Sequence, residues 1–270
     1  MIVPMLMLGL ASVSAIAAKV YYDTNFLKVN RIEFHSPKLP KGSEFTILQI
    51  SDLHNKVFKN NNAEFIRTVE NLKADIIVIT GDLVDRRTND LCHVFQLIDK
   101  LASLKSKIYF VTGNHEWGNP LLEDLLEGFR KRNVNILDNK SVQLRVDDIT
   151  LNIVGIADYS KKHSNLDKAF DGTNKENYTV LLSHAPGVMN ENECASADLI
   201  LSGHTHGGQV RLPLIGALVV PDEGLFPKYD KGIYEFKDNR FIYIDSGLGT
   251  SRLPIRFLNQ SQVSFITIKN

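Results

Sequence analysis

Five of the eight histidines in this chain lie in short polar motifs that directly follow apolar, strand-like runs. They are His54, His115, His184, His204 and His206. Aspartate, asparagine and glycine accompany them, and cysteine does not. Carboxylate and amide oxygens mixed with imidazoles, without thiolate, suit a catalytic Mn, Fe, Zn or Mg centre better than a structural zinc site. The motifs therefore predict a site for two divalent metal ions.

Three further motif residues supply oxygen ligands: Asp52, Asp82 and Asn114. Asp52 and His54 alternate along an extended segment, so both side chains can point into one crevice. The two histidines of the Gly-His-Thr-His motif alternate in the same way. Gly81 and Asp82 end an apolar run, and this tight turn makes Asp82 the candidate carboxylate bridge between two ions. Asn114 adds a neutral oxygen ligand.

His115 directly follows a predicted ligand, so we expect its side chain to point elsewhere and to serve the reaction. It is the candidate general acid for the leaving-group oxygen, or a donor to the phosphoryl oxygens. Hydrolysis of a phosphate ester needs charge neutralisation and a hydroxide at neutral pH, and two cations about 3.5–4 Å apart provide both. The expected reaction is in-line attack of a metal-bound hydroxide on phosphorus.

Apolar runs and amphipathic stretches alternate through the first half of the chain. Apolar runs predict strands at residues 45–50, 76–79 and 108–111. Helical spacing of apolar residues predicts helices at residues 61–73, 89–104 and 120–132. Asp52, Asp82 and Asn114 follow at intervals of about thirty residues, the length of a βαβ unit, so we expect a largely parallel sheet. Residues just past its strands then meet in one crevice.

The second half of the chain is predicted to be mostly β. Alternating residues at 142–146 and 149–153 predict a hairpin. Apolar strands at 178–182 and 199–201 lead into two of the histidine motifs. Further strands are expected at residues 232–236, 241–244 and 263–268.

The chain of 270 residues is long enough for one large α/β domain, and no Pro/Gly/Ser-rich linker divides it. We expect one catalytic domain at residues 44–270, preceded by a polar connector at 19–43. Lys+Arg and Asp+Glu are balanced at 31 each, so the net charge gives no reason to expect nucleic-acid binding.

Residues 1–18 carry no charge, are mostly apolar and are followed by Lys19. Their length lies at the lower end of the roughly 17–25 residues that span a membrane. We expect an uncleaved N-terminal anchor and a membrane-associated protein. A cleaved signal, suggested by the small residues around 15–17, and a buried or interfacial helix are the alternatives. Lys19 alone does not decide the side of the membrane.

Taken in order, the motifs resemble those of the calcineurin-like metallophosphoesterase superfamily over about residues 45 to 255. The matching motifs are Asp52-x-His54, Gly81-Asp82, Gly113-Asn114-His115-Glu116, His184 and Gly203-His204-Thr205-His206. For one metal ion, the resemblance implies the ligands Asp52, His54, Asp82 and His206. For the second, it implies Asp82, Asn114, His184 and His204. It also implies a two-sheet β sandwich flanked by helices, an α/β fold with an α+β-like second half.

Within the superfamily, residues 51–55, 203–213 and 247–251 resemble a bacterial, often membrane-associated subgroup. That subgroup includes phosphodiesterases and lipid-nucleotide pyrophosphatases. The expected function is a phosphodiesterase with two divalent ions, Mn favoured, acting on a small-molecule or lipid phosphate ester. The first alternative is a nucleotide-lipid pyrophosphatase of the UDP-diacylglucosamine type.

Two more alternatives stay open. Asp85 and Arg86 after the Gly-Asp pair also resemble serine/threonine protein phosphatases, although the Gly-His-x-His motif argues against that branch. The other alternative is a non-catalytic metal-binding module at the membrane. The complete ligand set argues against it, because a module that only binds metal need not keep every ligand together with His115. The stretch 212–220 is either a core hairpin or an apolar lip that meets lipid.

Overall fold

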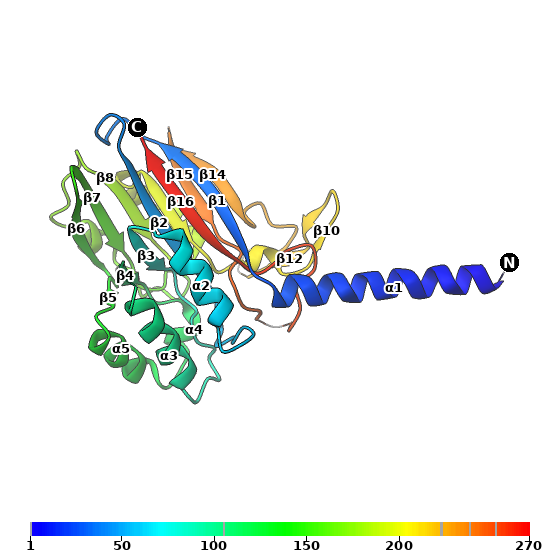
Figure 1. Ribbon diagram of the computed structural model, residues 1–270. Coiled ribbons are helices and arrows are strands. Elements are labelled where there is room, and N and C mark those ends of the chain that lie inside the picture. Colours follow the sequence, from blue (N-terminus) through cyan, green and yellow to red (C-terminus); the bar gives the residue numbers. More distant parts are fainter. Residues whose placement is uncertain (1, 105, 222–223, 238, 252) are drawn as a thin grey trace.

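The structure is a computed structural model that describes residues 2–104, 106–221, 224–237, 239–251 and 253–270, and the side chains of residues 2–6, 8 and 195 also lie outside the described part. Two six-stranded sheets form a sandwich, with helices on its outer faces (Figure 1). The mixed α/β fold with two sheets and flanking helices is therefore confirmed.

The first sheet is mixed, and its strand order is β1-β16-β2-β3-β4-β5. The strands are β1 (Lys28–His35), β2 (Glu44–Ile50), β3 (Ile76–Ile79), β4 (Lys107–Phe110), β5 (Asn135–Ile136) and β16 (Gln262–Lys269). Every pairing is parallel except that of β16 with β2. The helices of this half are α2 (Ala63–Leu72), α3 (Cys92–Ala102), α4 (Asn114–Trp117) and α5 (Leu122–Lys131). The expected parallel βαβ units are thus present in β2, β3 and β4.

The second sheet has the order β14-β15-β9-β8-β7-β6. Its strands are β6 (Lys140–Val146), β7 (Ile149–Gly155), β8 (Tyr178–Leu182), β9 (Leu199–Ser202), β14 (Gly232–Lys237) and β15 (Arg240–Ile244). The pairing of β6 with β7 is antiparallel, so the predicted hairpin is confirmed. Short helices accompany the sheet: α6 (Leu166–Phe170), η1 (Pro186–Asn190), η2 (Asn192–Ser196) and η3 (His206–Gly208).

Side chains of the first sheet alternate between two hydrophobic cores. Ile47 of β2 and Val78 of β3 pack in the core between the sheets. Their sequence neighbours Leu48 and Ile77 point to the opposite face of the sheet and pack against helices α2, α3 and α5. All four residues of β3 are buried, as expected for a parallel strand covered on both faces. This packing fixes where the strands end, and hence where the motif residues lie.

The N-terminal part differs from the expected connector. Helix α1 (Ile2–Asn25) projects from the body, and β1 follows it as an edge strand paired with β16 (Figure 1). Ile32 and Phe34 are buried while Arg31 and Glu33 between and beside them are exposed. This one-sided burial makes the strand polar in composition, which is why it resembled a connector. The sheet thus begins within residues 19–43, and the other domain boundaries stay a prediction.

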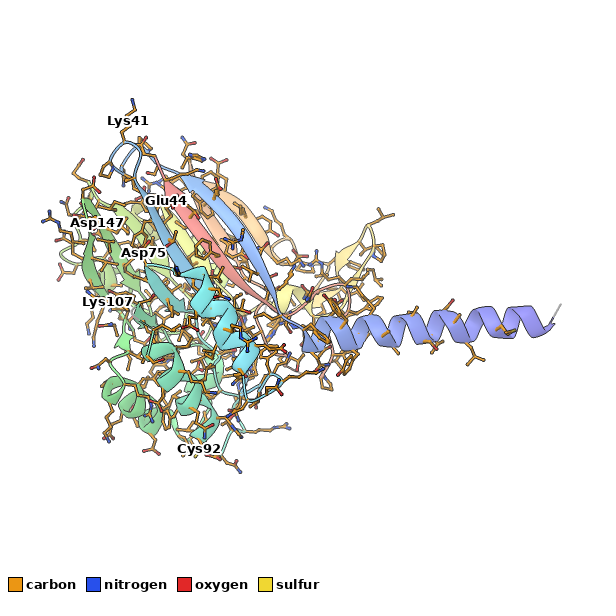
Figure 2. All side chains as sticks on the ribbon, viewed as in Figure 1. Lys41, Glu44, Asp75, Cys92, Lys107 and Asp147 are labelled. Atoms are coloured by element: carbon orange, nitrogen blue, oxygen red, sulfur yellow. The ribbon has the colours of Figure 1, made fainter. Side chains whose placement is uncertain are left out.

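The N-terminal anchor is tested only in part. Within the described residues, none of the helices combines the length and the apolar character needed to cross a membrane. Of the predicted anchor at residues 1–18, residue 1 and the side chains of residues 2–6 and 8 lie outside the described part. The described side chains of α1 from Met7 to Ile16 are exposed, and Figure 2 shows this part of the helix projecting from the body.

Two short hairpins contain the stretch 212–220, for which a core hairpin and an apolar lip are the two alternatives. They consist of β10 (Arg211–Leu212), β11 (Gly216–Ala217), β12 (Val219–Val220) and β13 (Gly224–Leu225). Ala217 and Val220 are buried, whereas Leu214, Leu225 and Phe226 are largely exposed. The stretch is therefore anchored by two side chains and presents others at the surface.

Candidate metal centre

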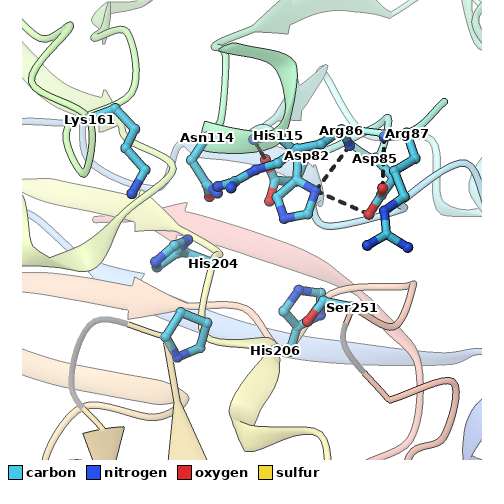
Figure 3. Close-up of a pocket in the computed structure, with 11 residues that line it drawn as sticks. Asp82, Asp85, Arg86, Arg87, Asn114, His115, Lys161, His204, His206 and Ser251 are labelled. Carbon is cyan, nitrogen blue, oxygen red and sulfur yellow. Dashed lines mark hydrogen bonds and ion pairs between the residues drawn. The ribbon is translucent and has the colours of Figure 1, made fainter. Parts of the chain in front are cut away.

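The predicted ligands meet at one edge of the sandwich. Asp52, Asp82 and Asn114 follow β2, β3 and β4 of the first sheet, whereas the histidine ligands 184, 204 and 206 follow β8 and β9 of the second. His54 lies two residues beyond Asp52. Because parallel strands end at the same edge, both sheets deliver their polar residues to one place. Figure 3 shows the resulting cluster, with His204 and His206 facing Asn114 and His115.

The backbone turns sharply at these positions. Asp52, His54, Asp82, His204 and His206 all have positive φ, between 49° and 73°. Residues other than glycine rarely adopt positive φ, and each instance costs on the order of 1–3 kcal/mol. Such a conformation persists only where the surrounding structure enforces it. Such strain is concentrated at functional sites.

Glycines at two positions allow the loops to approach closely. A Cβ at Gly203 would overlap the Ser51 hydroxyl and the Asp52 carboxylate. A Cβ at Gly113 would overlap Oδ1 of Asp82. Larger residues at these positions would therefore push the two sheets' ligand loops apart.

The first group of candidate ligands contains Asp52, His54 and His206, whose ligand atoms lie within 4.8 Å of one another. The Nε2 atoms of His54 and His206 are 3.0 Å apart, and Nε2 of His206 is 3.6 Å from Oδ1 of Asp52. Two ligand atoms about 2.1 Å from one ion, at right angles, lie about 3.0 Å apart. The spacing of the two imidazoles therefore fits a shared cation.

The second group contains Asp82, His184 and His204, again within 4.8 Å. Nε2 of His184 lies 3.1 Å from Nδ1 of His204 and 3.2 Å from Oδ2 of Asp82. Oδ1 of Asn114 is 3.2 Å from the same Nε2 atom. These separations match those of the first group, so the predicted amide ligand stands beside the second group.

Asp82 faces both groups through one oxygen. Its Oδ2 lies 3.2 Å from Nε2 of His184 and 3.7 Å from Nε2 of His54. Its Oδ1 accepts a hydrogen bond of 2.9 Å from the backbone N–H of His115. The carboxylate is thus oriented from behind and held between two sets of imidazoles, as a bridging ligand would be.

The electrostatics of the first group suit a cation. Burial lowers the pKa of His54 to about 4 and the pKa of His206 well below its ordinary value, so both rings are neutral at pH 7. Neutral imidazole is the form that coordinates metal. Within the described residues, Nδ1 of each ring is buried without a hydrogen-bond partner. Burial raises the pKa of Asp52 to about 6, a penalty that a bound cation would remove.

Asp82 and His184 form an ion pair in the metal-free chain. Burial alone lowers the pKa of His184, but the Asp82 carboxylate outweighs this and raises it to about 10. Burial likewise raises the pKa of Asp82, and His184 more than offsets it, so that pKa lies below its ordinary value. A cation between them would take the place of the His184 proton.

His115 stands beside an aspartate that the sequence analysis did not include among the site residues. Nδ1 of His115 lies 3.2 Å from Oδ2 of Asp85, and the ring borders the cavity of the site. The local signal for Asp85 is its spacing in Gly-Asp-x-x-Asp, a pattern that also resembles the protein phosphatases.

Glu116 connects the loops that carry Asp82 and His115. It is fully buried and accepts hydrogen bonds from the backbone N–H groups of Asp82, Val84 and Gly113, at 2.7, 3.2 and 2.8 Å. Burial raises the pKa of Glu116 to about 7. Its contacts favour a role in fixing the geometry of both loops.

A cavity of about 560 Å³ opens over the two groups. Its lining residues are Asp82, Asp85, Arg86, Arg87, Asn114, His115, Lys161, His204, His206, Pro221 and Ser251. Lys161 lies on the opposite side of the cluster from Arg86 and Arg87 (Figure 3). Among the described residues, the side chains of these three cations form no ion pair. A second cavity of about 650 Å³ adjoins the first, because both are lined by His204 and Pro221.

Fold and site together define a class: a two-sheet α/β sandwich with two groups of carboxylate and imidazole ligands at its strand ends. Residues 45–208 match the calcineurin-like phosphoesterase family, and the chain belongs to that family. The superfamily resemblance of the motifs is confirmed, and the bacterial subgroup stays a prediction.

Known relatives agree with this assignment. An uncharacterized metallophosphoesterase of Aquifex aeolicus is 32% identical, over 94% of this chain and 96% of its own. A bovine "transmembrane protein with metallophosphoesterase domain" is 29% identical over 89% of this chain and 57% of its own. The structure of Thermus thermophilus sulfate thiohydrolase SoxB shares the fold, with a TM-score of 0.50 and 15% identity, over 77% of this chain and 53% of that one.

Proposed function

We propose that this member of the family is a phosphodiesterase that uses two divalent ions. One ion would be held by Asp52, His54, Asp82 and His206, and the other by Asp82, Asn114, His184 and His204. The observation that carries the proposal is the Oδ2 atom of Asp82, which faces an imidazole of each group, at 3.7 and 3.2 Å. Mixed oxygen and imidazole ligands suit Mn, Fe or Zn, and Mn is the ion we favour.

The residues of the chain would divide the chemistry. Bound ions neutralise the phosphoryl oxygens and lower the pKa of water. His115 would protonate the leaving-group oxygen from Nε2, because its Nδ1 atom faces Oδ2 of Asp85 at 3.2 Å and accepts from the backbone N–H of Arg86 at 3.4 Å. Burial lowers the pKa of His115, which makes its protonated form a stronger acid, and Asp85 favours that form. Arg86, Arg87 and Lys161 would attract an anionic substrate into the cavity.

The cavities support a diester over a monoester. A phosphodiester carries two organic substituents on one phosphorus. Two adjoining cavities meet at His204, so each substituent has a space of its own beside the ligand groups. The second space is lined by Tyr159, Pro186 and Lys162, which suits a partly polar substituent.

Comparing diester with monoester turnover tests the proposal. We expect the full chain, stripped of metal and reconstituted with Mn, to hydrolyse bis(p-nitrophenyl) phosphate with a higher kcat/KM than p-nitrophenyl phosphate. Both activities should disappear with EDTA. Preference for the monoester would refute a phosphodiesterase, and no hydrolysis of any ester by metal-loaded protein would favour the non-catalytic binding module.

A nucleotide-lipid diphosphate is the second candidate substrate, favoured by the apolar surface beside the cavity. Pro221 lines the cavity, and Leu225 and Phe226 in the same hairpin region are 73% and 67% exposed. Cleavage of a UDP-linked lipid in mixed micelles, compared with UDP-glucose, tests the substrate.

We also propose that residues 1–18 associate with a membrane, which the exposed apolar side chains of α1 and the name of the bovine relative support. Flotation of the full chain and of residues 19–270 with vesicles tests the membrane association.

A further inference from the structure

The last turn of α1 is built into the catalytic domain. Asp23 is fully buried although it lies at the end of a projecting helix, and Lys19 pairs with its Oδ1 at 2.7 Å. A buried carboxylate costs free energy unless it is paired and hydrogen-bonded. Its other oxygen, Oδ2, accepts from the backbone N–H of Asn259 at 3.3 Å. The end of α1 is thus fastened to a loop 236 residues away in the sequence.

Further hydrogen bonds tie the segment 256–261 to the same turn. Thr24 Oγ1 accepts from the backbone N–H of Arg256 at 2.8 Å. The carbonyl of Asp23 accepts from the N–H of Ser261 at 2.8 Å, and the carbonyl of Thr24 accepts from Oγ of Ser261 at 3.1 Å. Lys56, just beyond the His54 motif, also donates to the Thr24 carbonyl. Residues 256–261 and Lys56 therefore share one support.

The supported segment in turn holds the first ligand group. Nδ2 of Asn259 donates to the backbone carbonyl of His206 at 2.6 Å. The buried guanidinium of Arg256 donates to the carbonyl of Gly249 at 2.8 Å, and the N–H of Gly249 donates to the carbonyl of Asp52 at 2.6 Å. Two members of the first group are thus connected to Asp23 and Thr24 through one or two intermediate residues.

Asp82 and His184 of the second group rest on different supports, whereas the backbone N–H of His204 donates to the Asp52 carboxylate at 3.1 Å. Nδ1 of His184 bonds to the carbonyl of Thr80, at 2.8 Å, at the end of β3. Glu116 braces the backbone of Asp82 from the α4 loop at 2.7 Å. These contacts come from within the sandwich, whereas the supports of the first group run outward to α1. The two groups therefore differ in what positions them.

We propose that the C-terminal turn of α1 positions the first metal group, Asp52, His54 and His206, and supports the second group far less. Asp23 and Thr24 are its positioning residues, acting through Asn259 and Arg256. This inference rests on the proposed two-metal function. Removing groups that hydrogen-bond directly to metal ligands typically lowers metal affinity about 10- to 100-fold, so a group one residue further out is expected near the lower end of that range. Loosening this turn therefore weakens the binding of one ion much more than that of the other.

Metal titration of the full chain tests the proposal in two backgrounds. In His184→Ala, which leaves the first group, Asp23→Ala should weaken the binding of Mn by about tenfold or more. In His54→Ala, which leaves the second group, Asp23→Ala should change it by less than about twofold. Calorimetry and the metal content after gel filtration give the readout without any assay of activity.

A matched control separates positioning from general loss of stability. Asp198 likewise pairs with a lysine, Lys38, and accepts from a backbone N–H, that of Thr179, each at 2.8 Å. Asp198→Ala should leave Mn binding unchanged in both backgrounds. Circular dichroism melting checks that the variants fold. If Asp23→Ala does not fold, the same titrations are made with Thr24→Val, which keeps the side-chain volume and should also weaken Mn binding only where the first group is left.

The outcomes are distinct. Equal weakening in the two backgrounds, or no weakening in either, would overturn the inference. Wild-type protein that takes up fewer than two ions would instead overturn the proposed function, and the inference with it. Asp23→Asn, which keeps an acceptor oxygen for Asn259, should restore most of the affinity for the first ion.

Discussion

The two sheets contribute different atoms to the same pair of ligand groups. The first sheet supplies the oxygen ligands Asp52, Asp82 and Asn114, together with His54. The second supplies only imidazoles, at positions 184, 204 and 206. Neither sheet completes the first or the second group alone, because each of these two joins residues of both sheets. The first sheet therefore sets the charge of the site, and the packing of the second onto it sets whether two ions can bind.

The core between the sheets fixes the separation of these contributions. Ile47 and Val78 of the first sheet pack in one cluster with Val180 and Leu199 of the second. Close-packed cores resist small displacements. The Nε2 atoms of His54, from the first sheet, and His206, from the second, lie 3.0 Å apart. This distance therefore depends on how the core packs the two sheets together.

Substitution of the shared carboxylate should have the largest effect. Asp82→Asn removes the charge of the carboxylate whose Oδ2 faces both groups, so we expect both ions to bind weakly and kcat/KM to fall by about a thousandfold, the upper end for one electrostatic group. Steady-state hydrolysis with Mn, together with metal content, gives the answer. Asp198→Asn serves as the control and should keep activity. A variant at position 82 that retains two ions would contradict the bridging role.

Loss of the candidate general acid should come next. His115→Gln is expected to lower kcat by about a hundredfold for esters with poor leaving groups and less for p-nitrophenyl esters, because a good leaving group needs no proton. Metal content should stay at the wild-type value. Equal losses on both kinds of ester would argue that His115 binds the phosphoryl oxygens instead.

A smaller effect is expected from the cationic rim on the second-sheet side of the cavity. Lys161→Met should raise KM for an anionic diester about fivefold with little change in kcat, the scale of one partly exposed ion pair. Lys162→Met, at the adjoining cavity, is the matched comparison. The KM difference should shrink at high salt, and a salt-independent effect would point to a change in structure.

The last prediction concerns stability rather than activity, namely its pH dependence without metal. The pKa of His184 is about 10 in the fold, compared with 6.5 unperturbed. The native state therefore holds an extra proton between these values, so its free energy of unfolding should fall as pH rises through this window, by at most about 1.4 kcal/mol per unit. Urea unfolding in EDTA at several pH values measures this. His184→Gln should flatten the slope, and a slope of opposite sign would refute the ion pair.

Local patterns carried the prediction of the ligands and of most elements. An apolar run followed by Asp or His predicts a strand end with a polar residue on it, and this holds for Asp52, Asp82 and His184. Edge strand β1 was missed because Arg31 and Glu33 interrupt its apolar residues. Asp85 was left out of the site because nothing local places it 3.2 Å from His115.

The sequence by itself determined the kinds of ligand, their order and the family, because each motif is a property of a few adjacent residues. Only the tertiary structure decided which ligands share a group, that one oxygen of Asp82 faces both, and that Asp23 and Asn259 support one group. Those facts depend on contacts between distant segments. Such contacts are set by how two sheets and a helix pack together, which no local pattern records.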